Sequence, residues 1–174
     1  MRRYAEFPKA QTSPGRGGWS RTACVVTAED GTWGFGMTPH SGPVIPLIND
    51  HLGPILEGQS CMAIEKTWDI MQRSTSAFGT AGLASYAISA VDNALWDLRA
   101  KIAGIPLPRL LGTVKERVPC YRSAFHHPDM EESVEEALEV KRLGYLGYKL
   151  HAYHGVELDI RVGRMVRGGV GDGL

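Results

Sequence analysis

Apolar and polar positions near the start of the chain predict a pair of strands. Apolar residues dominate 23–28, the dipeptide Asp30–Gly31 follows, and a second strand-forming run covers 32–36. Asp-Gly between two such runs is a strong signal for a tight β-hairpin. We therefore expect an antiparallel pair of strands here, followed by a loop over residues 37–43.

Apolar residues then recur every three to four positions in three segments, the spacing that places side chains on one face of a helix. The predicted helices cover residues 43–56, 62–73 and 83–103. In the second helix, the expected core positions are Ile64, Trp68 and Met71. In the third and longest, the predicted buried stripe consists of Ala84, Ala87, Ile88, Val91, Leu95, Leu98 and Ile102. Gly104 ends this helix, and the prolines that follow prevent it from resuming.

From residue 118 onward, short apolar runs alternate with helical segments, which predicts a parallel sheet covered by helices. Strands are expected over 118–123 and 144–151, and helices over 129–143 and 157–167. Residues 168–174 are predicted to form the turn into a further strand. The fold class is therefore α/β.

The same helical spacing predicts the faces of the two later helices. At the start of the first, Asp129 is placed to cap the helix N-terminus. Its predicted buried positions are Val134, Ala137 and Leu138. Its predicted solvated face carries Glu131, Glu132, Glu135, Glu136 and Glu139. In the second helix, the predicted inward positions are Leu158, Val162 and either Met165 or Val166.

The strand predicted over residues 144–151 carries the best catalytic candidates. Side chains alternate along a strand, so Tyr148 and Leu150 share one face while Lys149 and His151 share the other. A buried strand face tolerates ionisable side chains where it opens into a site, and in barrels of parallel strands such sites lie at the strands' C-terminal ends. Lys149 and His151 are therefore the candidate catalytic residues, although an edge strand with one solvated face fits the same pattern.

Composition narrows the choice of partners and compartment. The 174 residues are 43% hydrophobic and include 19 basic and 19 acidic side chains, so no net charge favours nucleic acid or an anionic membrane as a partner. No apolar run approaches the roughly 20 residues that span a bilayer, and the start lacks the apolar core of a secretion signal. Three dispersed cysteines fit a reducing compartment, so we expect a cytoplasmic protein. Residues 1–20, rich in Gly, Pro, Ser and Arg, are expected to be flexible.

Two motifs give the chain a family resemblance. Residues 90–97 read A-V-D-N-A-L-W-D, and residues 104–112 read G-I-P-L-P-R-L-L-G. Together with the hairpin at 29–36, they resemble the enolase superfamily, and more closely its mandelate racemase and muconate-lactonising branch. The resemblance implies an α+β cap domain over residues 21–112. Residues 113–174 would then be the first βα units of an incomplete (β/α) barrel.

This resemblance implies Mg²⁺-dependent abstraction of the proton α to a carboxylate. In the family, the second barrel strand ends in K-x-K or K-x-H, and Lys149-Leu150-His151 stands at that place. His151 would be the base facing the α-carbon, and Lys149 the cation near the substrate carboxylate. Within the branch, the sequence is most similar to dehydratases that convert a sugar acid to a 2-keto-3-deoxy acid. Racemases, epimerases and cycloisomerases are the alternatives.

The chain departs from the family pattern beyond its second barrel strand. The family's three metal carboxylates lie at the ends of the third, fourth and fifth strands, and the sequence stops at Leu174, where the third is expected. We therefore expect a truncated enzyme whose Mg²⁺ ligands are absent from this chain, and no activity from the chain alone. The alternative is a non-catalytic oligomerisation or binding module, and uncovered apolar surface favours a homo-oligomer in either case.

Overall fold

The computed structural model describes residues 21–39, 41–124, 127, 129–151 and 155–174, so the flexibility expected of residues 1–20 lies outside it. The chain divides into two compact units, with the boundary between Thr113 and Val114. Each unit has its own cluster of buried apolar side chains. None of the described helices is both long and apolar enough to cross a membrane.

The first unit begins with the antiparallel hairpin that the sequence predicts. Strand β1 (Arg21–Thr27) pairs with strand β2 (Trp33–Pro39) along their whole lengths. The turn between them is closed by the Ala28 N–H, which donates to the Thr32 carbonyl at 2.8 Å. Gly31 occupies this turn with a φ of 84°, a conformation that glycine adopts at no steric cost.

Helices follow the hairpin directly, and the predicted loop over 37–43 is wrong because β2 runs to Pro39 and the next helix begins at Ser41. The elements are α1 (Ser41–Pro46), the π-helical segment η2 (Leu47–Leu52), α2 (Gly53–Leu56), α3 (Ile64–Thr75), the 3₁₀ turn η3 (Ser76–Phe78), α4 (Leu83–Ile102) and α5 (Leu107–Leu111). The predicted helix over 43–56 is present, but its hydrogen-bonding pattern changes midway. The Gly53 N–H donates to the Ile48 carbonyl, five residues back instead of four.

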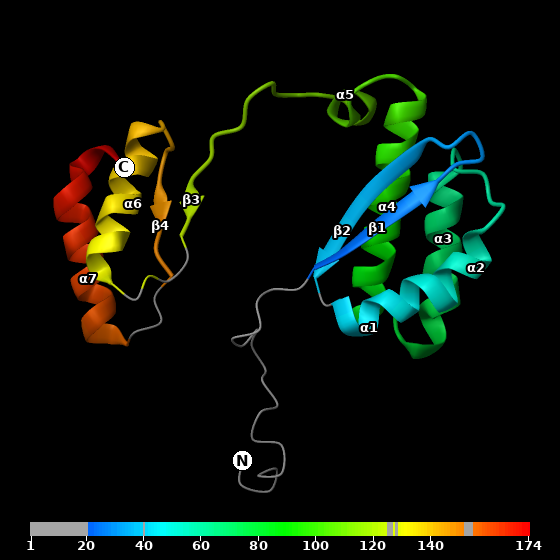
Figure 1. The fold of residues 1–174 in the computed structure, drawn as a ribbon, viewed down its shortest axis with the longest axis horizontal. Helices are drawn as coiled ribbons and strands as arrows, with labels where there is room; N and C mark the ends of the chain where they lie inside the picture. The colour runs from blue at the N-terminus through cyan, green and yellow to red at the C-terminus, as the bar shows by residue number, and fades with distance from the viewer. Residues whose placement is uncertain (1–20, 40, 125–126, 128, 152–154) are drawn as a thin grey trace, which may run out of the picture. The chain divides into compact units, whose positions relative to one another are not determined.

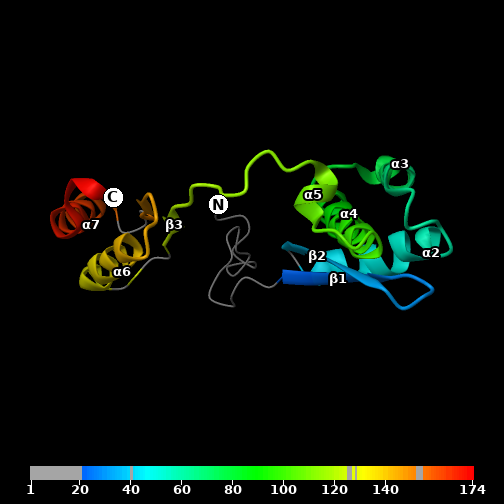
Figure 2. The same ribbon diagram turned by 90° about the horizontal axis from the view of Figure 1, so that it is seen from above.

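Helix α4 packs directly on the hairpin, as Figures 1 and 2 show, through two glycines of β2. A Cβ atom at Gly36 would lie 1.9 Å from the Ala90 carbonyl oxygen, and one at Gly34 would lie 2.0 Å from the Ala94 carbonyl oxygen. The missing side chains let the strand and helix backbones meet. The predicted stripe of α4 is buried except at its last member, Ile102, which is 41% exposed.

Helix α3 buries two of the three predicted side chains, Ile64 and Met71, but not the third. The buried positions are Ile64, Thr67, Met71 and Thr75, whereas Trp68 is 45% exposed, so its assignment to the core is wrong. Threonine serves in this row because its hydroxyl can bond within the helix, as Thr67 Oγ1 does to the Ala63 carbonyl at 3.0 Å. The spacing of apolar residues did not indicate this row, because two of its four members are threonines.

The second unit is a strand–helix–strand–helix arrangement. Its elements are β3 (Arg122–Ser123), α6 (Met130–Arg142), β4 (Tyr148–Lys149), α7 (Val156–Val170) and the 3₁₀ turn η4 (Gly171–Gly173). β3 and β4 are parallel, which confirms the predicted pairing, but each strand is two residues long. Helices α6 and α7 lie side by side on one face of this pair (Figures 1 and 2). The turn predicted over 168–174 begins later than expected, because α7 continues to the buried Val170 and only Gly171–Gly173 form a turn.

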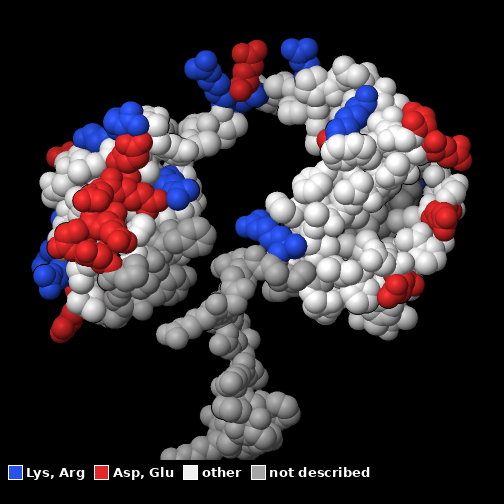
Figure 3. Space-filling model, in the orientation of Figure 1, with Lys and Arg blue, Asp and Glu red and all other residues white. Residues whose placement is uncertain are grey.

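Helix α6 confirms part of its predicted pattern. The Asp129 side chain caps it by accepting from the Glu131 N–H at 3.0 Å. Its buried positions are Ser133, Ala137 and Val140. The predictions for Leu138 and, on α7, Leu158 are wrong, since these side chains are 45% and 41% exposed. Acidic side chains gather over α6 in Figure 3, where the exposed members are Glu131, Glu132, Glu135 and Glu139.

Candidate functional site

The candidate site lies where two neighbouring parallel strands end. Arg122 pairs with Tyr148 and Ser123 with Lys149 across β3 and β4. The ladder includes the Arg122 N–H bonded to the Gly147 carbonyl at 2.9 Å and the Ala124 N–H bonded to the Lys149 carbonyl at 3.0 Å. Because parallel strands point the same way, the residues that end them meet at one edge of the sheet.

The predicted alternation of side chains along β4 is present. Tyr148 and Leu150 pack against the apolar cluster formed by α6 and α7. Lys149 is exposed and His151 is half-buried. Alternation along the strand directs both side chains to the side opposite Tyr148 and Leu150. Lys149 ends β4 and His151 follows it by two positions, and the catalytic roles of both stay a prediction.

His151 has a partner that the sequence did not indicate. Its Nε2 atom lies 2.9 Å from Ser123 Oγ, and which of the two groups donates depends on the imidazole tautomer. The two residues are 28 positions apart and meet only because β3 and β4 pair in this register. The strand register would have been needed to predict Ser123 as a site residue. In that register Ser123 pairs with Lys149, which precedes His151 by two positions.

Lys149 supplies the positive charge of the site. Within the described residues, its ammonium group makes no hydrogen bond and no ion pair that would neutralise it. A cation and an imidazole at one strand edge can bind a carboxylate and accept a proton beside it. Ser123 adds a hydroxyl that contacts the imidazole directly.

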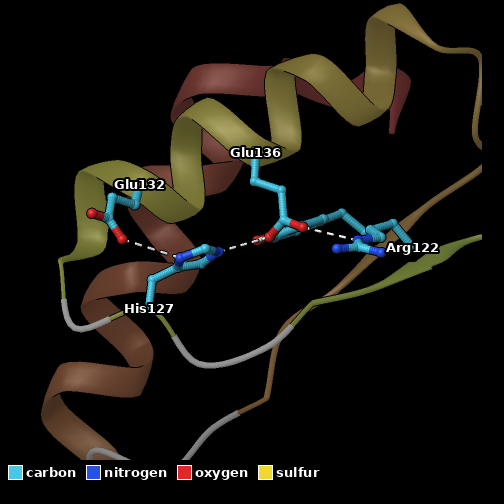
Figure 4. A network of polar contacts seen from close by, with 5 residues as sticks. Arg122, His127, Glu132 and Glu136 are labelled. Atoms are coloured by element: carbon cyan, nitrogen blue, oxygen red, sulfur yellow. Dashed lines mark hydrogen bonds and ion pairs between the residues drawn. The ribbon is translucent and has the colours of Figure 1, made fainter.

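A second cluster of polar side chains lies on the helix side of the same strands. Glu136 of α6 accepts from Arg122 Nε and from the Tyr148 hydroxyl, each at 2.8 Å. His127 lies between two carboxylates, with Nε2 2.8 Å from Glu136 and Nδ1 3.2 Å from Glu132, as Figure 4 shows. The side chain of Glu136 is only 19% exposed, so its predicted place on the solvated face of α6 is wrong.

The charges of this cluster support one another. Burial acts to raise the pKa of Glu136, but hydrogen bonds from its three partners outweigh burial and hold that pKa below its usual value. The hydrogen bond to Glu136, against a smaller effect of burial, raises the pKa of His127. Burial, followed by the hydrogen bond to Glu136, raises the pKa of Tyr148, so its hydroxyl stays a donor. The carboxylate therefore remains ionised among cationic and hydroxyl donors.

The described residues do not fit a magnesium site. Among them, no three His, Cys, Asp or Glu side chains are grouped so that they could hold a metal ion. Lys149, His151 and Ser123 include no carboxylate, and carboxylates are the ligands that Mg²⁺ prefers. No chemical step is therefore assigned to a metal bound by these residues.

An open pocket of about 440 Å³ runs beside the strands without containing the Ser123–His151 pair. It is lined by residues 119–121 and 146–149, most of which precede the strand ends. Of the candidate residues, only Lys149 borders it. The pocket therefore lies mainly beside the segments that lead into β3 and β4, and the Ser123–His151 pair lies outside it.

Comparisons with known proteins point to one family. The model of the mandelate racemase / muconate lactonizing enzyme N-terminal domain matches residues 12–112. L-rhamnonate dehydratase from Saccharopolyspora erythraea is 36% identical over 156 residues, which make up 89% of this chain and 37% of that relative.

Solved structures agree with this match in both sequence and fold. L-talarate/galactarate dehydratase from Salmonella typhimurium LT2, liganded with Mg and L-lyxarohydroxamate, superposes with a TM-score of 0.78 at 29% identity, covering 87% of this chain and 40% of that one. A mandelate racemase/muconate lactonizing enzyme-like protein from Rubrobacter xylanophilus gives a TM-score of 0.82 at 27% identity, covering 88% and 43%. These likenesses confirm the predicted fold class and the resemblance to the enolase superfamily. The chain spans about two fifths of the length of each of these relatives.

Proposed function

Because the chain belongs to the mandelate racemase / muconate lactonizing enzyme family, we propose that it provides the cap domain and first two barrel strands of a sugar-acid dehydratase. The observation that carries this proposal is the group formed by Ser123, Lys149 and His151 at the C-terminal ends of adjacent parallel strands. The dehydratases among its relatives support dehydration over racemisation or cycloisomerisation. The substrate would be a small polyhydroxylated carboxylate.

In the proposed reaction, His151 removes the proton α to the substrate carboxylate. Such a C–H is a weak acid, so its removal needs a positioned base and stabilisation of the charge that develops on the carboxylate oxygens. Lys149 supplies positive charge on the same strand face. Ser123 holds the imidazole at 2.9 Å and so limits its rotation. The hydroxyl group at the next carbon then leaves as water, taking up the proton that the His151 imidazolium holds, which gives the enol of a 2-keto-3-deoxy acid and restores the neutral imidazole.

Magnesium is the cofactor that this family implies, and structural relatives are described with it bound. We place its ligands on polypeptide outside the 174 residues, because the described residues do not fit the ion. The isolated chain is then expected to be inactive. Measurable Mg²⁺-dependent turnover of L-rhamnonate, talarate or galactarate by the purified 174-residue chain would contradict that expectation.

The test of the proposed function begins at the encoding locus. Reading it beyond both ends of the chain, in all frames, should reveal further barrel strands ending in acidic residues. The complete product, purified with Mg²⁺, should convert a sugar acid to a 2-keto-3-deoxy acid. His151→Asn and Lys149→Met should each lower kcat by about 100-fold or more. Lys66→Met, at an exposed lysine of α3, is the matched control and should leave kcat unchanged.

Two outcomes would overturn the proposal. A locus without further strand-end carboxylates in any frame leaves no enzyme for the site to serve. Full activity of His151→Asn would show that His151 is not the base.

A second function, self-association through the cap hairpin, has one observation in its favour. The side of the hairpin turned away from α4 exposes several large apolar side chains, namely Val25, Trp33, Phe35 and Met37, with exposed fractions of 44–56%. Apolar surface of this kind commonly marks an interaction site. Light scattering on the purified chain should then show a homo-oligomer, and a monomer at all concentrations would exclude this function.

A further inference from the structure

Glu136 is the residue through which three separate segments are joined. Its carboxylate accepts from Arg122 on β3, from His127 in the segment that follows β3, and from Tyr148 on β4, each at 2.8 Å. Its side chain is 19% exposed. A carboxylate removed from water to this degree is retained at low cost only when its lone pairs are satisfied, and here three donors satisfy them.

Two of these partners immediately precede the candidate site. Arg122 and Tyr148 face each other in the β3–β4 ladder, and the next pair along is Ser123 and Lys149. Side chains alternate along a strand, so Arg122 and Tyr148 reach α6 while Ser123 and Lys149 emerge on the other side. One carboxylate on the helix side therefore holds both strands one residue before the position where the site begins.

Backbone hydrogen bonds from Leu146 to Cys120, from Arg122 to Gly147 and from Ala124 to Lys149 join the two segments, and the side-chain bonds to Glu136 add to what fixes their register. β3 and β4 pair over two residues each, and a slip of one residue would move every side chain of a strand to the opposite face. Such a slip would separate Ser123 Oγ from His151 Nε2, now 2.9 Å apart. In the observed register Arg122 and Tyr148 both bond to one carboxylate, and a slip of one residue would turn one of the two side chains away from α6.

We propose that Glu136 is a positioning residue for His151, acting through the strand register that brings Ser123 to the imidazole. The catalytic meaning of this arrangement rests on the proposed function, whereas the arrangement itself does not. Glu136 bonds to Arg122 and Tyr148, and neither of these bonds involves Ser123 or His151. Removing its carboxylate should nevertheless loosen the Ser123–His151 contact.

The test reads the His151 ring directly in the 174-residue chain by its ¹⁵N chemical shifts, which report tautomer and hydrogen bonding. Ser123→Ala gives the shift that follows from losing the contact. Glu136→Gln should move the His151 signals in the same direction, whereas Glu135→Gln, at the exposed neighbouring position, should not. In the double variant Glu136→Gln/Ser123→Ala, the second change should add nothing, because both act on one contact.

Amide exchange provides a second readout of the strand register. The Ala124 N–H bonds across the ladder to Lys149, so Glu136→Gln should speed its exchange by roughly tenfold, as expected for loss of a hydrogen bond to a charged group. Glu135→Gln should leave that rate unchanged. Should Glu136→Gln unfold the unit, Tyr148→Phe removes only one of the three bonds and should give a smaller His151 shift in the same direction.

The proposal is overturned if His151 keeps its shifts in Glu136→Gln and Tyr148→Phe while the His127 signals move. Glu136 would then fix only the segment after β3. An additive effect in the double variant would also overturn it. Since neither readout needs turnover, a confirmed role for Glu136 can coexist with an active His151→Asn enzyme, which would refute only the proposed function.

Discussion

Replacing Gly36 by alanine should destabilise the first unit severely, because the new Cβ has no room. It would lie 1.9 Å from the Ala90 carbonyl oxygen and 2.9 Å from the Ala94 nitrogen, both backbone atoms of α4. Ordinary contact begins near 3.4 Å, so strand and helix would have to separate by about 1.5 Å. Neither backbone can rotate away as a flexible side chain would.

Overpacking a well-filled core costs typically 1–3 kcal/mol, and we expect about 3 kcal/mol here because the neighbour is helix backbone. For a unit of this size, that loss corresponds to a fall in Tm of roughly 12–24 °C. The matched control is Gly42→Ala, since no atom lies within 4 Å of the Cβ position at Gly42. Its effect should stay below about 1 kcal/mol.

Tryptophan fluorescence during urea unfolding isolates this unit from the other. All four tryptophans, Trp19, Trp33, Trp68 and Trp96, precede residue 114. The urea midpoint of Gly36→Ala should fall well below those of wild type and Gly42→Ala, with an unchanged slope. Equal midpoints for the two variants would refute the inference that β2 approaches α4 through its glycines.

Two further predictions concern the buried row of α3 and the charges around Glu136. Met71→Ala should cost about 2–5 kcal/mol in unfolding free energy because Met71 is fully buried, whereas Trp68→Ala should cost about 1 kcal/mol or less; the reverse order in urea unfolding would restore Trp68 to the core. The raised pKa of His127 means that its protonated form favours the folded state, so this contribution is full below its unfolded pKa of about 6.5 and is lost as pH rises through the folded pKa. The lowered pKa of Glu136 acts in the opposite sense, and its contribution is lost as pH falls below about 4.5. The stability of the second unit, followed by amide exchange, should therefore decline above pH 6.5 by less than about 1 kcal/mol, and His127→Gln should abolish that decline; a decline that persists in the variant would assign it to another group.

The elements themselves could be predicted from the sequence because they depend on local patterns. Asp30 and Gly31 specify a turn whatever surrounds them, and the spacing of apolar residues in 83–103 suffices for a long helix. The exact limits of each buried face depend on the tertiary structure. Trp68 and Leu138 lie one position beyond the rows that are buried, a shift of about 100° around a helix. An apolar residue at the margin of a stripe is buried only if the neighbouring element extends over it.

The candidate site divides in the same way. Period-two alternation along β4 is a property of the strand, so the sequence alone placed Lys149 and His151 on one face and Tyr148 on the other. Ser123 and Glu136 belong to segments that lie 28 and 15 residues before His151 in the chain, and no local pattern relates them to it. Their positions follow from the register of β3 against β4 and from the rotation of α6 above them. The sequence determined which residues are the catalytic candidates, and tertiary structure decided what holds them, because hydrogen bonds act over a few ångströms in space irrespective of distance along the chain.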